Sequence, residues 1–253
     1  MRACTKFAAA CILGALVWMP QTATTAAELV ILTNQGATPG VRELAAAFER
    51  VSGHKVTVMQ EEGASLERRI ETGPADLVTG NPPTIEQLVK NGRVVASTVT
   101  PFVLAGLGLS VRAGAPKPDI STVEAYKATL LAAKSIGYSR GCSGTNVAEG
   151  IAQIGLTEQL KAKTIFTSGG PVADALARGD FEVGIQQTNI MVGVPGTQYV
   201  GPLPGSLNKP CPSSVALLRV SKEPDAAREM IKFMISPQAA PLLRKTHVEP
   251  AKP

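Results

Sequence analysis

The stretch ELVILTNQGATPGVRELAAAFERVSGHKVTVM, residues 28–59, decides the fold of this chain. It begins with a short apolar run that predicts a strand over Glu28–Thr33. Apolar residues then recur at helical spacing from Val41 to Ser52, and Gly53 follows where a helix C-cap favours a left-handed residue. The β-branched run from Lys55 to Met59 predicts a second strand. A strand, a helix and a second strand in this order indicate an α/β sheet.

The same alternation continues along the chain and predicts two doubly wound sheets, each with helices on both faces. A second α/β unit occupies residues 103–195, and two later strands, at 198–203 and 213–220, are expected to return to the first unit. We therefore expect lobe 1 to comprise residues 28–102 and 196–253, and lobe 2 to comprise residues 103–195. A ligand cleft should lie between the lobes, with a hinge near residues 99–103 and 194–200.

The first 27 residues have the features of a cleavable signal peptide. Arg2 and Lys6 form a basic start, and Phe7 to Met19 is an apolar run too short to span a membrane. A small-residue region follows, with cleavage expected after Ala26 or Ala27. We therefore expect a soluble, exported, periplasmic protein without membrane insertion of the mature chain. Loss of the two basic residues lowers the net charge from +5 to +3, which indicates no nucleic-acid partner.

Two cysteines, Cys142 and Cys211, remain after the signal peptide. In an oxidising compartment this number suggests one disulfide. A catalytic thiol would need a histidine partner, and neither His54 nor His247 lies in an obvious site loop. The sequence has no zinc-ligand spacing, nucleophile elbow, phosphate-binding loop or dinucleotide fingerprint, so no metal or cofactor is expected.

The most distinctive loop is YSRGCSGTN, residues 138–146. It carries three hydroxyl side chains, two glycines and one guanidinium, between a predicted strand and a predicted helix over Val147–Leu156. Backbone amides at a helix N-terminus bind anions, and glycine permits close approach of a ligand. The same residue types also occur as ordinary helix caps. The loop therefore indicates either an anion cradle or a capped helix.

The order of several motifs resembles the periplasmic molybdate-binding-protein-like family, a branch of the type 2 solute-binding proteins. The likeness extends from about residue 28 to 251. It rests on the strand LVIL at 29–32, the helix end AFERVSG at 47–53, GPADLV at 73–78, GGPVADALARGD at 169–180 followed by FEVGIQQ at 181–187, and the tail around SPQAA at 236–240. This resemblance implies a two-lobe type 2 binding protein that holds a small anion in the cleft.

The resemblance implies that hydroxyl groups and backbone amides at helix starts hold the anion. When the family's ligand contacts are transferred to the matching motifs, they fall in five loops of this chain. The expected ligand-binding residues are Asn34, Ala37, Thr38, Ser65, Ser139, Arg140, Ser143, Gly144, Thr145, Ser168, Gly170 and Gln187. For each of them, helix capping or loop hydrogen bonding is the alternative role.

Three departures from the family pattern favour an organic carboxylate over molybdate. Glu61 and Glu62 precede the second loop, and a carboxylate repels a dianion unless it turns away. The fifth loop has glutamines where the family has a tyrosine, and the first loop has Asn34 in place of a serine. Arg140 adds a charge whose planar fork matches a carboxylate. A solvated loop charge is the alternative role for Arg140.

The resemblance therefore implies a periplasmic receptor of an ABC transporter, acting as a monomer with a permease partner. The same branch of the family also resembles exported aconitate isomerase, which leaves an enzyme as the alternative. Isomerisation requires a base that moves an allylic proton, and the candidates are Glu61, Glu62 and Asp76. Asp76 lies just inside a predicted strand and is also a candidate for a structural role, and a solvated strand end is the alternative role of Glu61 and Glu62.

Overall fold

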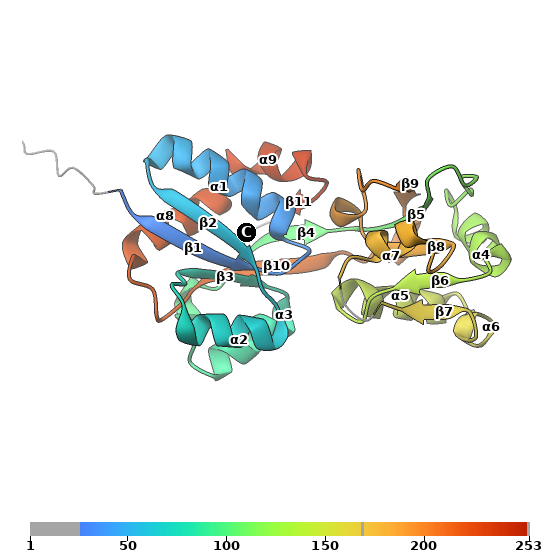
Figure 1. Ribbon diagram of the computed structural model, residues 1–253, viewed down its shortest axis with the longest axis horizontal. Helices are drawn as coiled ribbons and strands as arrows, with labels where there is room; N and C mark the ends of the chain where they lie inside the picture. The colour runs from blue at the N-terminus through green and yellow to red at the C-terminus, as the bar shows by residue number, and fades with distance from the viewer. Residues whose placement is uncertain (1–25, 168–169, 252–253) are drawn as a thin grey trace, which may run out of the picture.

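The computed structural model describes residues 26–167 and 170–251, and its strands form two sheets that lie side by side (Figure 1). The six-stranded sheet contains β1 (Glu28–Thr33), β2 (Lys55–Gln60), β3 (Leu77–Gly80), β4 (Thr100–Ala105), β10 (Cys211–Leu217) and β11 (Glu249–Pro250), in the order β11-β4-β10-β3-β1-β2. The five-stranded sheet contains β5 (Leu107–Arg112), β6 (Ile136–Tyr138), β7 (Thr164–Phe166), β8 (Val183–Gln187) and β9 (Thr197–Pro202), in the order β7-β6-β8-β5-β9. The predicted α/β class with two lobes is confirmed.

Both sheets mix parallel and antiparallel pairs. In the first sheet β1 pairs in parallel with β2 and β3, whereas β10 runs antiparallel to β3 and β4. In the second sheet β6 pairs in parallel with β7 and β8, whereas β5 runs antiparallel to β8 and β9. The carboxyl ends of the parallel strands are where ligands bind in open α/β sheets.

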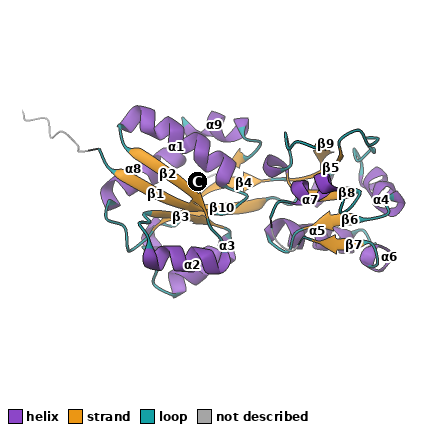
Figure 2. Ribbon diagram, in the orientation of Figure 1, coloured by secondary structure: helices purple, strands orange, loops and turns teal. Residues whose placement is uncertain are grey.

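Helices cover both faces of each sheet (Figure 2). Around the first sheet they are α1 (Thr38–Ser52), α2 (Gly63–Thr72), α3 (Pro82–Lys90), α8 (Pro224–Met234) and α9 (Ala239–Lys245). Around the second sheet they are α4 (Val123–Ala132), α5 (Cys142–Gln153), α6 (Thr157–Lys161) and α7 (Val172–Arg178). Each sheet therefore has its own core on either face.

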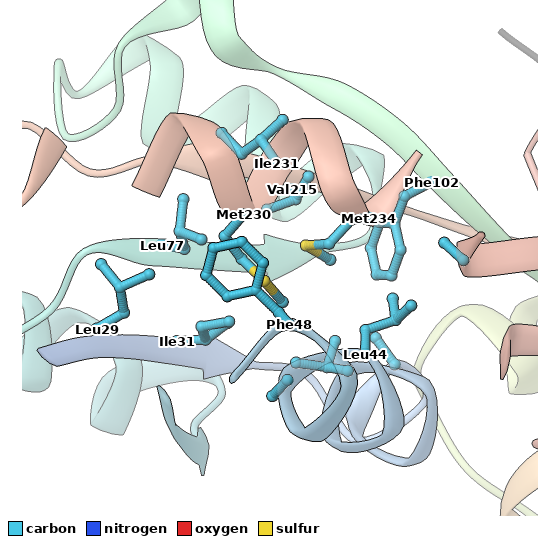
Figure 3. Packing of buried hydrophobic residues seen from close by; sticks show 14 of the residues in the cluster. Leu29, Ile31, Leu44, Phe48, Leu77, Phe102, Val215, Met230, Ile231 and Met234 are labelled. Carbon is cyan, nitrogen blue, oxygen red and sulfur yellow. The ribbon is translucent and has the colours of Figure 1, made fainter. Parts of the chain in front are cut away.

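Strand β1 shows how the alternating side chains build these two cores. Ile31 packs with the face covered by α1, α8 and α9, where Phe48, Met230 and Met234 lie together (Figure 3). The next residue, Leu32, packs on the opposite face with the buried side chains of α2 and α3. Successive strand residues point to opposite faces, so the unbroken apolar run Leu29–Leu32 is the expected pattern for a strand covered on both sides.

Two helices start earlier than the sequence predicts. Helix α1 begins at Thr38, although the Thr-Pro-Gly segment was expected to belong to a loop, because Pro39 suits the first turn of a helix. Helix α5 begins at Cys142, five residues before the expected start at Val147. Small hydroxylated residues favour loops and caps, and here they form the first helical turn instead. The expected loop is consequently reduced to Ser139–Gly141.

The chain passes between the sheets at different places from those expected. Strand β9 pairs with β5, so Thr197–Pro202 belongs to the second sheet, and the expected return to the first lobe at residue 196 is wrong. The outward crossing lies at Gly106, between β4 and β5, and the return lies at residues 203–210. The two crossings contact each other, since the Asn208 Oδ1 atom accepts a hydrogen bond from the Leu107 amide at 2.6 Å. Strand pattern alone does not reveal which sheet a strand joins.

The proposed signal peptide falls almost entirely outside the described residues. Ala27 is buried at the start of the structure, where its amide donates to His54 Nδ1 at 3.0 Å. Among the helices in residues 26–167 and 170–251, none is long and apolar enough to cross a membrane.

Candidate functional site

A cavity of about 460 Å³ lies between the two lobes at the carboxyl ends of their parallel strands. Its first-lobe lining is Asn34, Gln35, Gly36, Glu61, Glu62, Gly63, Leu66, Thr79, Asn81, Thr84, Cys211, Pro212 and Ser213. Its second-lobe lining is Ser139, Arg140, Gly141, Cys142, Ser143, Thr167, Gly170, Gln186 and Gln187. This volume is in the range of small-molecule sites, and hydroxyl and amide groups dominate the lining.

The start of α5 forms one wall of the cavity. Ser139 and Ser143 share a hydrogen bond between their hydroxyl oxygens at 3.2 Å. Gly144 lies so close to the preceding loop that a Cβ atom there would be 1.6 Å from the Ser139 carbonyl oxygen. The first-turn amides of a helix have no intrahelical acceptor and carry partial positive charge. This wall can therefore donate several hydrogen bonds to an anion.

Arg140 is the cation of this wall. Its side chain is exposed and lines the cavity, and its guanidinium carbon lies 4.1 Å from the centre of the Phe166 ring. Phe166 in turn packs edge-on against Tyr138, with ring centres 5.1 Å apart. Burial raises the pKa of the Tyr138 phenol above its ordinary value of 10, although a hydrogen bond with Thr164 opposes the shift. The phenol is therefore uncharged at neutral pH.

The facing wall is built on Asn34, which directly follows β1. The Asn34 Oδ1 atom accepts a hydrogen bond from Thr79 at 3.2 Å, and its Nδ2 atom donates to Ser213 at 3.5 Å. Asn81, which follows β3, caps α3 by accepting hydrogen bonds from Thr84. Three neighbouring strands thus bring polar groups to one edge of the first sheet.

The two lobes touch along one side of the cavity. Gln186 Nε2 donates to the Gln35 side-chain oxygen at 3.2 Å, and Asn189 Nδ2 donates to the Gly36 carbonyl at 2.7 Å. Gly36 also packs against Gln187, because a Cβ atom on Gly36 would be 2.3 Å from the Gln187 amide nitrogen. Gln186 additionally accepts from the Val172 amide at the start of α7. Glutamine and asparagine side chains therefore close this side of the cavity.

The disulfide suggested by the cysteine count is present between Cys142 and Cys211, and it also crosses between the lobes. Cys142 is the first residue of α5 in the second lobe, and Cys211 is the first residue of β10 in the first sheet. Both residues line the cavity, and the bond ties the start of α5 to the strand that carries Ser213. Asn146 contacts the same region through a hydrogen bond to the Lys209 carbonyl at 3.1 Å.

Of the residues that the sequence assigns to ligand binding, five line the cavity: Asn34, Ser139, Arg140, Ser143 and Gln187, with the backbone of Gly170 as a sixth contributor. Ser168 lies outside the described residues. These six positions come from one expected loop of the first lobe and three expected loops of the second lobe, and all of them line the same cavity.

Other assigned residues lie outside the lining and have local roles. Ala37 is buried in the core, and the Thr38 hydroxyl donates to the Asn34 carbonyl at 3.0 Å in the first turn of α1. Ser65 forms a capping box with Glu62 at the start of α2. Gly144 provides space for the Ser139 carbonyl, and Thr145 is exposed. Thr38 and Ser65 therefore make local hydrogen bonds at the starts of their helices, which is the alternative role considered for them.

The three candidate bases have different environments. Asp76 is buried far from the cavity at the opposite end of β3, where it accepts hydrogen bonds from the Val30 amide and the Ser221 hydroxyl. Glu62 lines the cavity, accepts a hydrogen bond from the Gln35 amide and caps α2. Glu61 also lines the cavity, and its carboxylate makes no hydrogen bond or ion pair within the described part of the chain.

Three lining residues, Gln35, Gly36 and Gln186, fall within the expected loops without being named as ligand contacts. Other lining residues were not expected from the sequence, namely Thr79, Asn81, Thr84, Thr167 and Ser213. Asn81 and Thr167 directly follow strands, and a polar residue directly after a strand is a sequence feature that can indicate a cleft residue. Ser213 lies on a strand nearly 180 residues away from Asn34, and nothing local indicates its place. Within residues 26–167 and 170–251, no three His, Cys, Asp or Glu side chains gather as a metal site.

Comparison with known proteins agrees with this architecture. A family model described as "bacterial extracellular solute-binding protein" matches residues 29–249. An aconitate isomerase of a Pseudomonas species is 30% identical over 229 residues, which cover 88% of this chain and 87% of that protein. Molybdate-binding protein ModA of Azotobacter vinelandii is 24% identical over 234 residues, which cover 87% of this chain and 88% of that protein.

A solved structure has the same fold. The periplasmic molybdate-binding protein of Azotobacter vinelandii aligns with a TM-score of 0.71 at 17% sequence identity, over 89% of this chain and 99% of that chain. The predicted resemblance to molybdate-binding proteins is confirmed as a similarity of sequence and fold, and the resemblance to aconitate isomerase is confirmed as a similarity of sequence. The chain belongs to the family of bacterial extracellular solute-binding proteins.

Proposed function

We propose that the cavity binds a small organic anion with two or three carboxylates, and that the protein delivers it from the periplasm to an ABC-transporter permease. The observation that carries this proposal is Arg140, an exposed cation that lines the cavity beside the Ser139 and Ser143 hydroxyls and the start of α5. A guanidinium donates two parallel hydrogen bonds to a carboxylate. Helix amides and hydroxyls supply the other donors.

The charges of the cavity argue for a carboxylate ligand over a tetrahedral oxyanion. Glu61 and Glu62 line the first-lobe side, and Arg140 lines the second-lobe side. A compact dianion held between these walls would be repelled by two carboxylates. An elongated acid can place its carboxylates against Arg140 and α5, with its carbon chain between them and the glutamates. The cavity of about 460 Å³ has room for such a molecule.

A thermal-shift screen followed by calorimetric titration tests this proposal. Tricarballylate, citrate and succinate are compared with molybdate, tungstate and sulfate at equal concentration. A ligand at 100 times its Kd stabilises the protein by about 2.7 kcal/mol, so binders separate from non-binders. We expect stabilisation by at least one carboxylate and none by molybdate. Stabilisation by molybdate alone would contradict the proposal.

Isomerisation of aconitate is a second candidate function, favoured by Glu61 and by the 30% identical aconitate isomerase. A base removes a proton from the methylene carbon beside the double bond, the double bond shifts by one carbon, and a proton returns to the former vinyl carbon. Glu61 supplies a cavity carboxylate for both transfers. Arg140 and the amides of α5 would stabilise the charge that spreads onto a substrate carboxylate.

One assay separates the two functions. Purified protein is mixed with cis-aconitate in D2O, and the cis and trans isomers are followed by proton NMR. A receptor leaves the isomer ratio at that of the buffer, while an isomerase moves it towards equilibrium and incorporates deuterium. In the enzyme case Glu61→Gln should abolish turnover, and Glu67→Gln, at a half-buried position of α2 outside the cavity lining, should not.

A further inference from the structure

We propose that Phe166 is a positioning residue that holds Arg140 in the orientation that receives a ligand carboxylate. This inference rests on the proposed carboxylate function. Its evidence is the guanidinium of Arg140, which lies 4.1 Å from the centre of the Phe166 ring. Such a cation–π contact falls well within the range in which the interaction is attractive.

Phe166 lies at the surface end of β7, of which it is the last residue, and it is 41% exposed. Its ring makes two aromatic contacts, edge-on with Tyr138 and face-on with Arg140. The buried Tyr138 holds the ring, and the ring in turn supports the guanidinium.

A guanidinium stacked on the ring would keep its hydrogen-bonding edge free for a carboxylate. A guanidinium presents its face to an aromatic ring, whereas its N–H donors lie in its own plane. Arg140 forms no ion pair with any carboxylate in residues 26–167 and 170–251, although Arg93, Arg178 and Arg244 each do. In the proposed stacked orientation, the contact with Phe166 holds this arginine beside the cavity and leaves its donors to a carboxylate.

Ordering a long side chain in advance raises affinity, because ligand binding then immobilises fewer rotamers. The contact also lies beside the Ser139 and Ser143 hydroxyls. Carboxylate binding should consequently depend on the ring at position 166, even though Phe166 itself does not line the cavity.

A double-mutant cycle tests this inference with tricarballylate as the titrant. We expect Phe166→Leu to weaken binding about 3- to 30-fold, the range of one cation–π contact, and Phe166→Tyr to stay within about twofold of the wild type. In an Arg140→Gln background, Phe166→Leu should change affinity by less than about twofold. Ile165→Leu, an exposed change on the same strand, is the matched control and should have no effect.

The outcomes distinguish the positioning role of Phe166 from the proposed carboxylate function. Unchanged affinity of Phe166→Leu, with tricarballylate bound by the wild type, overturns the positioning role and leaves the carboxylate function intact. An equal loss in the Arg140→Gln background also overturns it, because the ring would then act independently of the arginine. If the wild type binds molybdate and no carboxylate, both proposals fail. Circular dichroism melting of each variant verifies that the fold is kept.

Discussion

The disulfide between Cys142 and Cys211 should contribute a large part of the stability of this protein. The bond closes a loop with a sequence separation of 69 residues, which includes nearly all of α5 to β9. Chain-entropy arithmetic for a loop of this length gives about 4.4 kcal/mol at 25 °C. Single domains are stable by only about 5–15 kcal/mol, so the Cys142→Ser/Cys211→Ser variant should lose about 30% or more of its free energy of unfolding.

Urea unfolding followed by far-UV circular dichroism measures this loss, since the only tryptophan, Trp18, lies in the predicted signal peptide. Wild-type protein treated with a reductant is the matched control, and it should unfold at the same urea concentration as the double variant. The variant should also bind ligand more weakly, because the bond ties the start of α5 to β10 across the cavity. A double variant within about 1 kcal/mol of the oxidised wild type, with unchanged ligand affinity, would refute this reasoning.

Three further changes probe the site and its support. Gly144→Ala should lower the free energy of unfolding by about 3 kcal/mol, because its Cβ would lie 1.6 Å from the Ser139 carbonyl oxygen. Gly150→Ala in the same helix is the control and should be neutral or stabilising. Urea titrations compare the two variants. Asp76→Ala should cost about 2–3 kcal/mol in the same assay, because it removes the acceptor of two hydrogen bonds, and it should leave ligand affinity unchanged; a changed affinity would assign Asp76 to the site. Gly36→Ala should weaken ligand binding about tenfold in calorimetry, because its Cβ would meet the Gln187 amide across the lobes. Equal affinity of the variant and the wild type would show that the lobes need not approach so closely.

Local patterns predicted most of the fold. The apolar run of β1 and the helical spacing of Val41, Leu44 and Phe48 predicted those two elements, because each buries its apolar face in a core. Sheet membership was harder, since β9 has the same strand pattern whichever sheet it joins. The start of α5 was missed because Ser143 and Thr145 favour loops on propensity, while the helix forms under tertiary packing.

The candidate site was predictable where side chains follow strands. Asn34, Ser139 and Gln187 lie at strand ends and line the cavity. Ser65 has the same chemistry but satisfies the start of its own helix, and sequence does not distinguish these two uses of a hydroxyl. The contact between Arg140 and Phe166 joins positions 26 residues apart, and it required the parallel pairing of β6 and β7 to be known.

Calorimetric titration of wild-type and Arg140→Ala protein with tricarballylate and with molybdate is the decisive experiment for a carboxylate site at Arg140. We expect the wild type to bind tricarballylate at micromolar concentration and molybdate not at all. We expect Arg140→Ala to bind tricarballylate about 10- to 100-fold more weakly, because hydrogen bonds to charged groups contribute about 1.5–3 kcal/mol. Equal affinity of the two proteins for tricarballylate, or tight binding of molybdate by both, would contradict the account.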